Sequence, residues 1–366
     1  MTAANTQAVM LAAGGTGGHM FPARATADAL RARGITVILS TDARGARYTD
    51  GFPADEIITL PAAQLPLRKP WAWPGAMMRI RAGIKAAHKA IKHYDVGCVA
   101  GFGGYPTVPG LLAAKTANIA TIIHDQNAVP GRVNRLFAGR VDAVFSGFPV
   151  AGTSAFARRA TVVGNPVRAA IANLADYQPP EPDGPLNLLI LGGSQGARIL
   201  GAQLPQALCA LPAPLRDRLR VVQQARAEQA DMVTQTYAKA RISAEVAPFF
   251  SDIPDRLATA HLVISRAGAS SVSELAASGR PSLLIPFAAA MDDHQTGNAQ
   301  TLVRAGAAVM LSEAEATPEH IVQTLQPLLQ TPDRLLAMAQ AARHQAQPDA
   351  AKRLADEIES RLKLRV

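Results

Sequence analysis

Two apolar runs of this chain lead directly into glycine-rich turns, one near the start of each half. Residues 8–13 (AVMLAA) precede GGTGGH at 14–19, and residues 186–191 (LNLLIL) precede GGSQGA at 192–197. A helical pattern follows each turn, and a strand, a glycine turn and a helix form the opening of a Rossmann-like domain. A chain of 366 residues also exceeds the usual size of a single hydrophobic core. The sequence therefore predicts two α/β domains with parallel sheets.

The most informative single stretch is GASSVSE at 268–274, which follows the apolar run 262–265. We expect a buried parallel strand, a tight turn and the start of a helix, whose exposed N–H groups and positive dipole end can bind phosphate. Glu274, one turn further, could accept hydrogen bonds from both hydroxyls of a ribose. A capping box formed by Ser271 and Glu274 is the alternative for this stretch taken alone. The similar turns elsewhere in the chain favour phosphate binding.

Three polar side chains of the first half follow predicted strands. His19 lies in the first glycine loop, Tyr105 follows the GFGG loop, and Asn127 ends the polar run HDQN. Because the carboxyl ends of parallel strands meet at one edge of a sheet, we expect these side chains to face the same space. Each could also be a turn former, but three convergent strand ends favour a site.

A nicotinamide-dependent oxidoreductase is an alternative for such a fold. The dinucleotide fingerprint requires a third glycine where this chain has Met20, so the fingerprint is not met. Asp42, near the end of the second predicted strand, keeps this interpretation open.

Residues 65–92 combine apolar and basic side chains without a single acidic residue. Trp71 and Trp73 stand just before a helical pattern that begins at Met77, and the basic residues continue to Lys92. Tryptophan with lysine and arginine is typical of a segment that lies on an anionic bilayer surface. The alternatives are a solvated basic face with both tryptophans in the core, and contact with nucleic acid. We favour the membrane surface.

The net charge of +9 is unevenly placed along the chain. Residues 1–168 hold 19 lysines and arginines against 8 aspartates and glutamates, whereas the remainder holds 18 against 20. The first half is therefore expected to face something anionic. We expect neither a membrane-spanning run nor a signal peptide, and Cys98 and Cys209 lack the spacing of metal ligands. This predicts a cytoplasmic protein without disulfides or zinc.

The proline-rich segment 176–184 is typical of an interdomain linker. We predict a first domain over 1–168 and a second over 169–348. A last helix over 349–364, with Leu354, Ile358 and Leu362 on one face, is expected to pack back on the first domain.

As an ordered set these motifs resemble the MurG family of bacterial glycosyltransferases, which add N-acetylglucosamine to lipid I to make lipid II. The resemblance spans residues 8–300, and the set comprises GGTGGH at 14–19, GGY at 103–105, Gln126-Asn127, NPVR at 165–168, GGSQGA at 192–197, Arg266-x-Gly268-Ala269 with Ser273-Glu274, and His294-Gln295 with Asn298-Ala299. Each motif alone is weak, whereas the ordered set is highly specific. The resemblance implies the α/β GT-B architecture, two Rossmann-like domains whose parallel sheets face each other across an interdomain cleft.

The resemblance also implies where substrates bind. UDP-N-acetylglucosamine would bind the second domain, with its ribose on Glu274, its diphosphate on Ser194 and its uracil on the backbone of Phe250. Gly103, Gly104 and Tyr105 would lie on the acceptor side. The full implied substrate-binding set is Thr16, Gly17, Gly18, Asn127, Arg168, Ser194, Phe250, Ala269, Ser270, Ser271, Val272, Ser273, Glu274 and Gln295.

Three departures from the family pattern are visible. Asp125 stands where the family often has glutamate, and QQAR at 223–226 replaces a His-Gln pair, so the role of that histidine is not carried over. Residues 288–291 (AAAM) are less polar than is usual before His294 and Gln295.

The chemistry implied is a single displacement with inversion at the anomeric carbon, in which the 4-hydroxyl of the N-acetylmuramyl sugar attacks and UDP leaves. No Asp-x-Asp metal motif is present, so we expect no metal or cofactor, and helix-end N–H groups would stabilise the charge on UDP. His19 is the candidate base, because histidine titrates near neutral pH. Another GT-B nucleotide-sugar enzyme, such as a different lipid glycosyltransferase or an epimerase, is the alternative.

The implied setting is the cytoplasmic face of the bacterial inner membrane, with residues 65–92 on its anionic surface as a peripheral contact. The expected partners are UDP-N-acetylglucosamine, lipid I and proteins of cell-wall synthesis, with no nucleic acid. The implied role is peptidoglycan synthesis, and through it cell shape and division.

Overall fold

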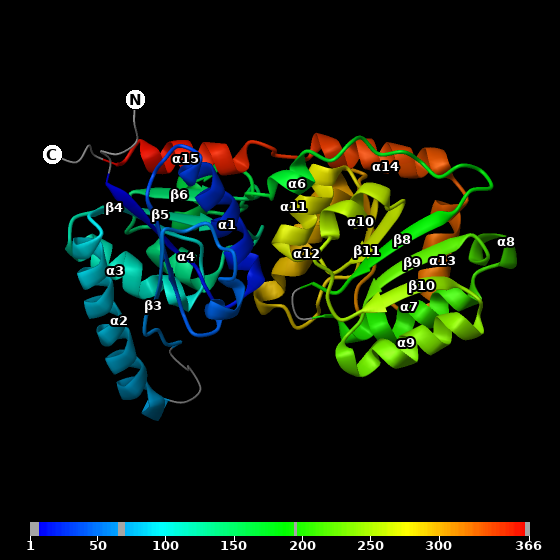
Figure 1. Cartoon of the computed structure of the whole chain (residues 1–366), viewed down its shortest axis with the longest axis horizontal. Helices are drawn as coiled ribbons and strands as arrows, with labels where there is room; N and C mark the ends of the chain where they lie inside the picture. Colours follow the sequence, from blue (N-terminus) through cyan, green and yellow to red (C-terminus); the bar gives the residue numbers. More distant parts are fainter. Residues whose placement is uncertain (1–6, 65–69, 194–195, 363–366) are drawn as a thin grey trace. The chain divides into compact units, whose positions relative to one another are not determined.

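Two parallel sheets form the frameworks of the chain, one in each of two units (Figure 1). The computed structural model describes residues 7–64, 70–193 and 196–362. The first unit comprises residues 1–168 with 348–366, and the second comprises residues 169–347.

The sheet of the first unit has seven parallel strands in the order β3-β2-β1-β4-β5-β6-β7. The strands are β1 (Ala8–Ala12), β2 (Val37–Thr41), β3 (Glu56–Thr59), β4 (Val96–Gly101), β5 (Ala120–Asp125), β6 (Ala143–Ser146) and β7 (Ala160–Val162). The helices of this unit are α1 (Gly17–Arg31), α2 (Trp73–His93), α3 (Val108–Thr116), α4 (Arg132–Phe137), α5 (Ala155–Arg159) and α15 (Ala350–Glu359), with 3-10 turns at Gly45–Tyr48, Pro70–Ala72 and Tyr105–Thr107.

Alternate residues of β1 pack on opposite faces of the first sheet, because successive side chains of a strand point to opposite sides. Val9 and Leu11 join a core with α1 and α15, whereas Met10 joins a core with α2 and α3. All five residues of β1 are buried. Burial on both faces explains the uninterrupted apolar run in the sequence.

The C-terminal helix α15 packs on α1 in the first unit. Arg33 links the two, since its Nη1 lies 2.7 Å from carboxylate oxygens of both Asp356 and Glu359, and its Nη2 donates to the carbonyl of Lys352. The helix ends at Glu359, which corrects the expected end at 364. The chain turns at Ser360, and Leu362 still packs against the core.

The sheet of the second unit has six parallel strands in the order β10-β9-β8-β11-β12-β13. The strands are β8 (Leu186–Leu191), β9 (Leu219–Gln224), β10 (Ser243–Ala247), β11 (Leu262–Ser265), β12 (Ser282–Leu284) and β13 (Ala308–Met310). The helices are α6 (Ala169–Ala172), α7 (Arg198–Ala210), α8 (Ala213–Arg216), α9 (Ala227–Lys239), α10 (Ile253–Thr259), α11 (Ala269–Ser278), α12 (His294–Arg304), α13 (Pro318–Leu329) and α14 (Pro332–His344), with a 3-10 turn at Met291–Asp293.

Both sheets reverse their strand order at one place. In the first unit β1 has β2 on one side and β4 on the other, and in the second unit β8 has β9 on one side and β11 on the other. Ligands of open parallel sheets bind outside the carboxyl ends of the strands at this reversal. The glycine turns after β1, β4, β8 and β11 all lie there.

Two helices begin earlier than the sequence pattern predicts. Helix α1 starts at Gly17, inside the glycine turn rather than after it, and α2 starts at Trp73 rather than Met77. Glycine is a weak helix former, so the periodic pattern hides a helix start inside a glycine loop. His19 therefore belongs to the first turn of α1.

Candidate active site

Asp42 ties together the glycine loops of the first unit. Its Oδ1 accepts hydrogen bonds from the amides of Gly15 (3.0 Å) and Gly45 (2.9 Å), and its Oδ2 accepts one from the Tyr105 hydroxyl. Burial opposes ionisation, but these hydrogen bonds outweigh it and hold the pKa of the Asp42 carboxyl below its ordinary value. A Cβ at Gly14 would lie 2.7 Å from Oδ1, so glycine is required at that position. Both carboxylate oxygens of Asp42 are thus engaged within the loops, which argues against the nicotinamide cofactor that this residue had left open.

His19 lies against the second glycine loop. Its Nδ1 is 3.1 Å from the carbonyl oxygen of Gly14, which makes Nδ1 the protonated nitrogen and Nε2 the basic one. A Cβ at Gly103 would lie 3.4 Å from Nε2, and a Cβ at Gly104 would lie 3.2 Å from Cε1. Both glycines have positive φ, at 92° and 74°. The loops after β1 and β4 therefore fit together only with glycine at these positions.

The loop that carries Asn127 is fixed by Asp125 and Asn134. Asp125 Oδ1 accepts from the Asn127 amide (2.9 Å), and its Oδ2 accepts from the Gly131 amide (2.7 Å) and from Asn134 Nδ2 (2.9 Å). Asn134 also adjoins the second glycine loop, since its Nδ2 would lie 3.3 Å from a Cβ at Gly103. The shorter carboxylate of Asp125 thus has a structural task, and the loop after β4 adjoins both the loop after β1 and the segment after β5.

His124 is a buried structural histidine. Its Nε2 donates to the carbonyl of Gly164 (2.9 Å), and its Nδ1 accepts from Gln126 (3.1 Å). Burial lowers the pKa of His124, so the ring is neutral. Asn165 of the NPVR motif donates to the carbonyl of Gln126 (2.9 Å) and joins this network.

In the second unit, helix α11 begins at the glycine turn after β11. Gly268 is its N-cap residue, and Val272 N donates to the Gly268 carbonyl (2.9 Å). Ser271 therefore lies inside the helix, which rules out the capping box between Ser271 and Glu274. The first N–H groups of α11 have no partner within the helix. The buried Oγ of Ser270 also has no hydrogen-bond partner among the described residues.

Arg266 and α12 fix the turn before α11. Arg266 is 7% exposed and makes two hydrogen bonds to the Glu313 carboxylate, at 3.1 and 3.2 Å. Burial opposes ionisation of Glu313, yet the bonds from Arg266 and the Ala288 amide hold its pKa below the ordinary value. From α12, Asn298 donates to the carbonyl of Ala267 (3.1 Å), and Gln295 accepts from the amide of Phe287 (3.0 Å).

The loops after β8, β9 and β10 are joined by Gln224. Its Oε1 accepts from the Gly192 amide (3.1 Å), and its Nε2 donates to the carbonyl of Pro248 (3.1 Å). The ring of Phe250 is 7% exposed, and the guanidinium carbon of Arg256 lies 4.1 Å from its centroid. The ring of Phe250 therefore packs against Arg256.

The comparisons with known proteins cover both units. The Glycosyltransferase family 28 N-terminal domain matches residues 9–146, and the Glycosyltransferase family 28 C-terminal domain matches residues 187–354. Two relatives are 46% and 49% identical to this chain, one from Allorhizobium ampelinum and one from Methylobacterium sp. (strain 4-46). Each is named UDP-N-acetylglucosamine--N-acetylmuramyl-(pentapeptide) pyrophosphoryl-undecaprenol N-acetylglucosamine transferase. These alignments cover 96% and 95% of this chain and 95% of each relative. The chain belongs to the MurG family of glycosyltransferases. The crystal structure of Acinetobacter baumannii MurG superposes with a TM-score of 0.79 at 33% identity, covering 97% of this chain and 99% of that one.

Membership of the MurG family confirms the predicted GT-B fold and sets aside the epimerase and the oxidoreductase. Among the predicted site residues, His19 lies beside Gly103 and Gly104, and Asp42 joins Tyr105 to the first glycine loop. In the second unit, residues 269–274 occupy the first turns of α11, beside α12 with Gln295.

Arg168 lies beside α1 of the first unit. The guanidinium of Arg168 lies 5.8 Å from the ring centroid of Phe21, within the first unit. Ser194 lies outside the described residues, as do residues 65–69 of the predicted basic segment.

Sequence reasoning missed the residues that anchor the MurG-type turns: Asn134, Gln224 and Glu313. The local sequence around each residue does not indicate a partner. Glu313 is 47 residues from its partner Arg266, and Asn134 is 9 residues from its partner Asp125. The one usable signal was Asp42, a carboxylate just after an apolar strand, for which the sequence suggested the wrong partner.

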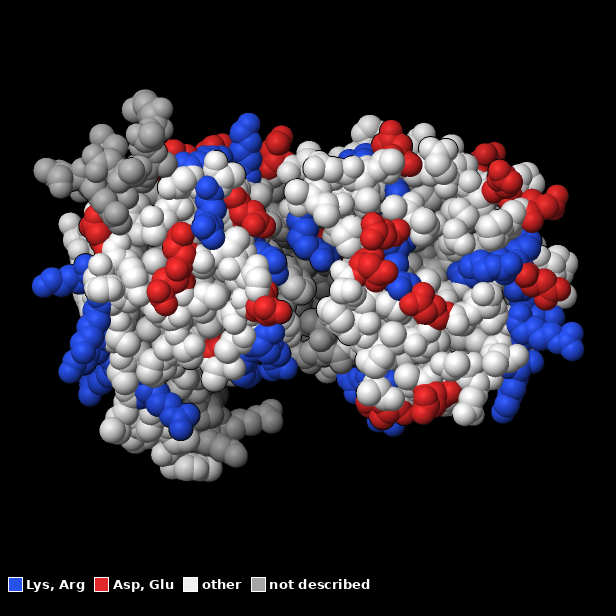
Figure 2. Space-filling model, in the orientation of Figure 1, with Lys and Arg blue, Asp and Glu red and all other residues white. Residues whose placement is uncertain are grey.

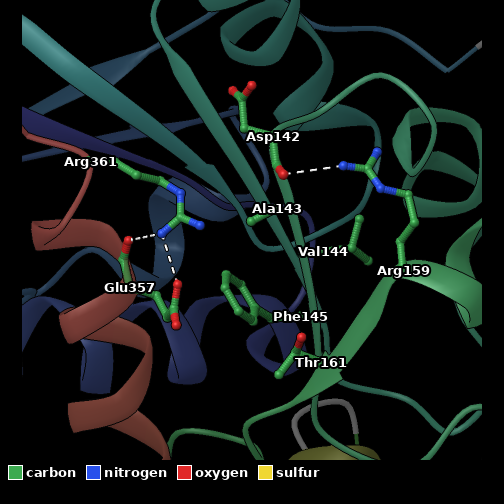
Figure 3. Close-up of a pocket in the computed structure, with 8 residues that line it drawn as sticks. All are labelled: Asp142, Ala143, Val144, Phe145, Arg159, Thr161, Glu357 and Arg361. Carbon is green, nitrogen blue, oxygen red and sulfur yellow. Dashed lines mark hydrogen bonds and ion pairs between the residues drawn. The ribbon is translucent and has the colours of Figure 1, made fainter.

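A cavity at the other end of the first sheet does not belong to the candidate site. Its lining includes Arg159, Phe145 and Thr161, together with Glu357 and Arg361 from the C-terminal segment (Figure 3). Arg361 Nη1 lies 2.8 Å from Glu357 Oε2, and Arg159 Nη2 donates to the carbonyl of Asp142, which precedes β6. The volume of this cavity is about 210 Å³.

In the described part of the chain, no three His, Cys, Asp or Glu side chains gather as a metal site would require.

We predict that Asp42→Asn lowers the free energy of unfolding at pH 7 by about 1–3 kcal/mol, because the ionised carboxylate accepts three hydrogen bonds. The pKa of Asp42 is lower in the folded chain, so this contribution is complete above about pH 4 and declines as the pH falls further. Urea unfolding at pH 7 and pH 3 measures it, with the exposed Asp50→Asn as control. A difference that is the same at both pH values would contradict the assignment.

Proposed function

We propose that this chain transfers N-acetylglucosamine from UDP-N-acetylglucosamine to the 4-hydroxyl of the muramyl sugar of lipid I, with inversion, and so makes lipid II for peptidoglycan. The observation that carries the proposal is the identity of 45–49% over about 95% of the chain to transferases named for this reaction. The glycine turns at both strand-order reversals support it, because both substrates of this reaction, the nucleotide sugar and lipid I, carry a pyrophosphate.

The second unit is the proposed donor site. The amides of Ala269, Ser270 and Ser271 open α11, and this end of a helix attracts phosphate. The unpartnered hydroxyl of Ser270 supports a polar ligand at the same place. Glu274 lies one turn further along, at the spacing that returns a side chain to the same helix face, and we assign the ribose hydroxyls to it. Val272, Ser273, Ser194, Gln295 and the Phe250 backbone complete the proposed donor set.

Charge on the departing UDP is the main electrostatic demand of the proposed reaction. Amides that are fixed before the reaction stabilise developing charge without reorganisation. The anchored turn before α11, held by Arg266 and Asn298, supplies such amides. This supports a mechanism in which the helix end, rather than a metal, assists the leaving group.

We predict that Glu274→Gln weakens UDP binding about 10-fold to 100-fold, the loss expected for hydrogen bonds to a charged group worth about 1.5–3 kcal/mol. Calorimetry with UDP measures the affinity, and Glu319→Gln, an exposed residue at the start of α13, is the matched control. The function itself is tested by adding UDP-N-acetylglucosamine and a short-chain lipid I analogue to the wild-type chain. Absence of acceptor-dependent UDP release would overturn the proposed function.

The first unit is the proposed acceptor site, with His19 as the base. The bond from Nδ1 to Gly14 leaves the lone pair on Nε2, which can accept the proton of the attacking hydroxyl. Thr16 supports this arrangement, because its Oγ1 lies 3.5 Å from the same Nδ1. Gly103, Gly104 and Tyr105 are the other proposed residues of the acceptor side. Thr16, Gly17, Gly18 and Asn127 are proposed to close on the transferred sugar, and Arg168 to contact the nucleotide.

We predict that His19→Ala lowers kcat about 100-fold to 10,000-fold, the usual range for loss of a general base. Single-turnover rates with saturating UDP-N-acetylglucosamine separate this effect from donor binding. His344→Ala, an exposed histidine at the end of α14, should leave the rate unchanged. A loss of only a few-fold in His19→Ala would remove this residue from the mechanism.

Helix α2 is the proposed contact with the membrane surface. Trp71, Trp73 and Met78 are 75%, 42% and 71% exposed, so the tryptophans do not fill the core. Arg79 and Lys85 are among the exposed basic residues of the same helix. Figure 2 shows basic side chains along the edge of the first unit where Figure 1 places α2. Exposed tryptophans beside cations suit the interface of an anionic bilayer.

This contact would place the chain as a peripheral protein on the cytoplasmic face of the bacterial inner membrane, where lipid I is presented. Among the described residues, no helix combines the length and the apolar character needed to traverse a bilayer. Proteins of cell-wall synthesis are the further proposed partners.

We predict that reversing three basic charges of α2 abolishes most binding to vesicles that contain acidic lipid, since each is worth about 1 kcal/mol near such a surface. Co-sedimentation with vesicles at low and high salt measures the binding. The reversed residues are Arg79→Glu, Arg81→Glu and Lys85→Glu. The matched control reverses three exposed basic residues of the second unit, Arg198→Glu, Lys239→Glu and Arg334→Glu. Equal binding of both triple variants would refute the assignment to α2.

A further inference from the structure

Arg44 carries a guanidinium with one edge fixed and the other edge open. Its Nε donates to the Tyr105 hydroxyl (3.0 Å), and its Cζ lies 4.9 Å from the centroid of the Tyr105 ring. The same Nε is 3.6 Å from Asp42 Oδ2. A flexible, exposed arginine has no reason to adopt one orientation, but these contacts from two different loops hold this one in place.

The open edge of Arg44 lies beside the first glycine loop. The side chain is 56% exposed, and a Cβ placed at Gly15 would lie 3.5 Å from Nη2. Within the described part of the chain, neither Nη1 nor Nη2 makes a hydrogen bond or an ion pair. Two parallel N–H donors on a planar cation match a phosphate or carboxylate in a bidentate manner.

The charges around Arg44 favour an anion at this edge. Asp42, the nearest acid, is 5% exposed and directs its oxygens toward Gly15, Gly45 and Tyr105. The first turn of α1, which begins at Gly17, carries no acidic residue. The positive end of a 15-residue helix and the guanidinium therefore act in the same direction.

We infer that Arg44 binds the pyrophosphate of the lipid acceptor, with Tyr105 and Asp42 as its positioning residues. This inference rests on the proposed function, which places the acceptor on the first unit. Of the two proposed substrates, lipid I carries a pyrophosphate that is separate from the diphosphate of UDP. Arg44 thus sets the preference for an acceptor that carries a pyrophosphate, and the donor contacts of the second unit do not depend on it.

The test compares Arg44→Gln and Arg44→Lys with Arg31→Gln, a control that removes the same charge from an exposed arginine of α1 paired with Asp55. Initial rates are measured while a short-chain lipid I analogue and UDP-N-acetylglucosamine are varied independently. In Arg44→Gln we expect the KM of the acceptor to rise about 10-fold to 100-fold, as for a charged hydrogen bond, while the KM of the donor stays constant. Arg44→Lys should lie between, because lysine keeps the charge but loses the fork.

A second readout separates this inference from the proposed function. Geranyl pyrophosphate carries the acceptor's linkage without a sugar, and its binding to each variant is measured by calorimetry together with geranyl monophosphate. The wild-type chain should prefer the pyrophosphate, and Arg44→Gln should lose that preference. Equal geranyl pyrophosphate affinity in wild type and Arg44→Gln overturns the role of Arg44. Normal pyrophosphate preference without any sugar transfer overturns the proposed function and leaves Arg44 as a pyrophosphate-binding residue.

Discussion

Hydrogen bonds from side chains to backbone groups hold the glycine turns at the carboxyl ends of the strands in shape. Glycine loses more conformational entropy on folding than any other residue, so a glycine turn needs support from outside itself. In the first unit Asp42 supplies it, by accepting from the amides of Gly15 and Gly45. In the second unit Asn298 supplies it, by donating to the carbonyl of Ala267. A turn held in this way can keep other amides turned toward a ligand, and the sites proposed for both units depend on that.

The two units repeat one layout with opposite charge at the anchor. The Asp42 carboxylate anchors the first site. The neighbouring side chains of His19, Tyr105 and Arg44 provide groups that can move a proton or pair with an anion. The buried cation Arg266 anchors the second site, where it is neutralised by Glu313. An ion pair with excellent geometry offsets the cost of burying its charges. With Arg266 neutralised, the start of α11 presents backbone amides and serine hydroxyls ahead of Glu274, which suits the diphosphate and ribose of the proposed donor.

The sequence predicted most of the framework, because strands buried on both faces read as unbroken apolar runs. The strands β8 and β11 begin and end where expected, whereas β3 and β13 were missed. The strand β3 is mostly exposed and β13 has three residues, so neither carries the apolar signal. The first glycine loop also concealed the start of α1, since glycine weakens the helical pattern that would reveal it.

The anchors of the site were beyond the reach of sequence patterns for a different reason. The Tyr105 hydroxyl and Asp42 are 63 residues apart, and neither local sequence indicates that the two side chains pair. Only the order of the strands, which puts β1 between β2 and β4, brings them together. The same holds for Phe250, whose ring orientation is decided by Arg256, itself held by Glu245 and Asp252.

The excess of positive charge in the first unit acts in two physically different ways. On α2 the basic side chains are exposed and attract an anionic surface without a fixed direction, so salt screens them over a distance of about 8–10 Å. Arg44 is held by Tyr105, and its effect depends on the direction of two N–H groups and on contact with the ligand. Direct bidentate bonds are less affected by screening than long-range attraction. In the proposed function, the same net charge would give the unit a salt-sensitive attraction to the membrane and a less salt-sensitive contact with one lipid upon it.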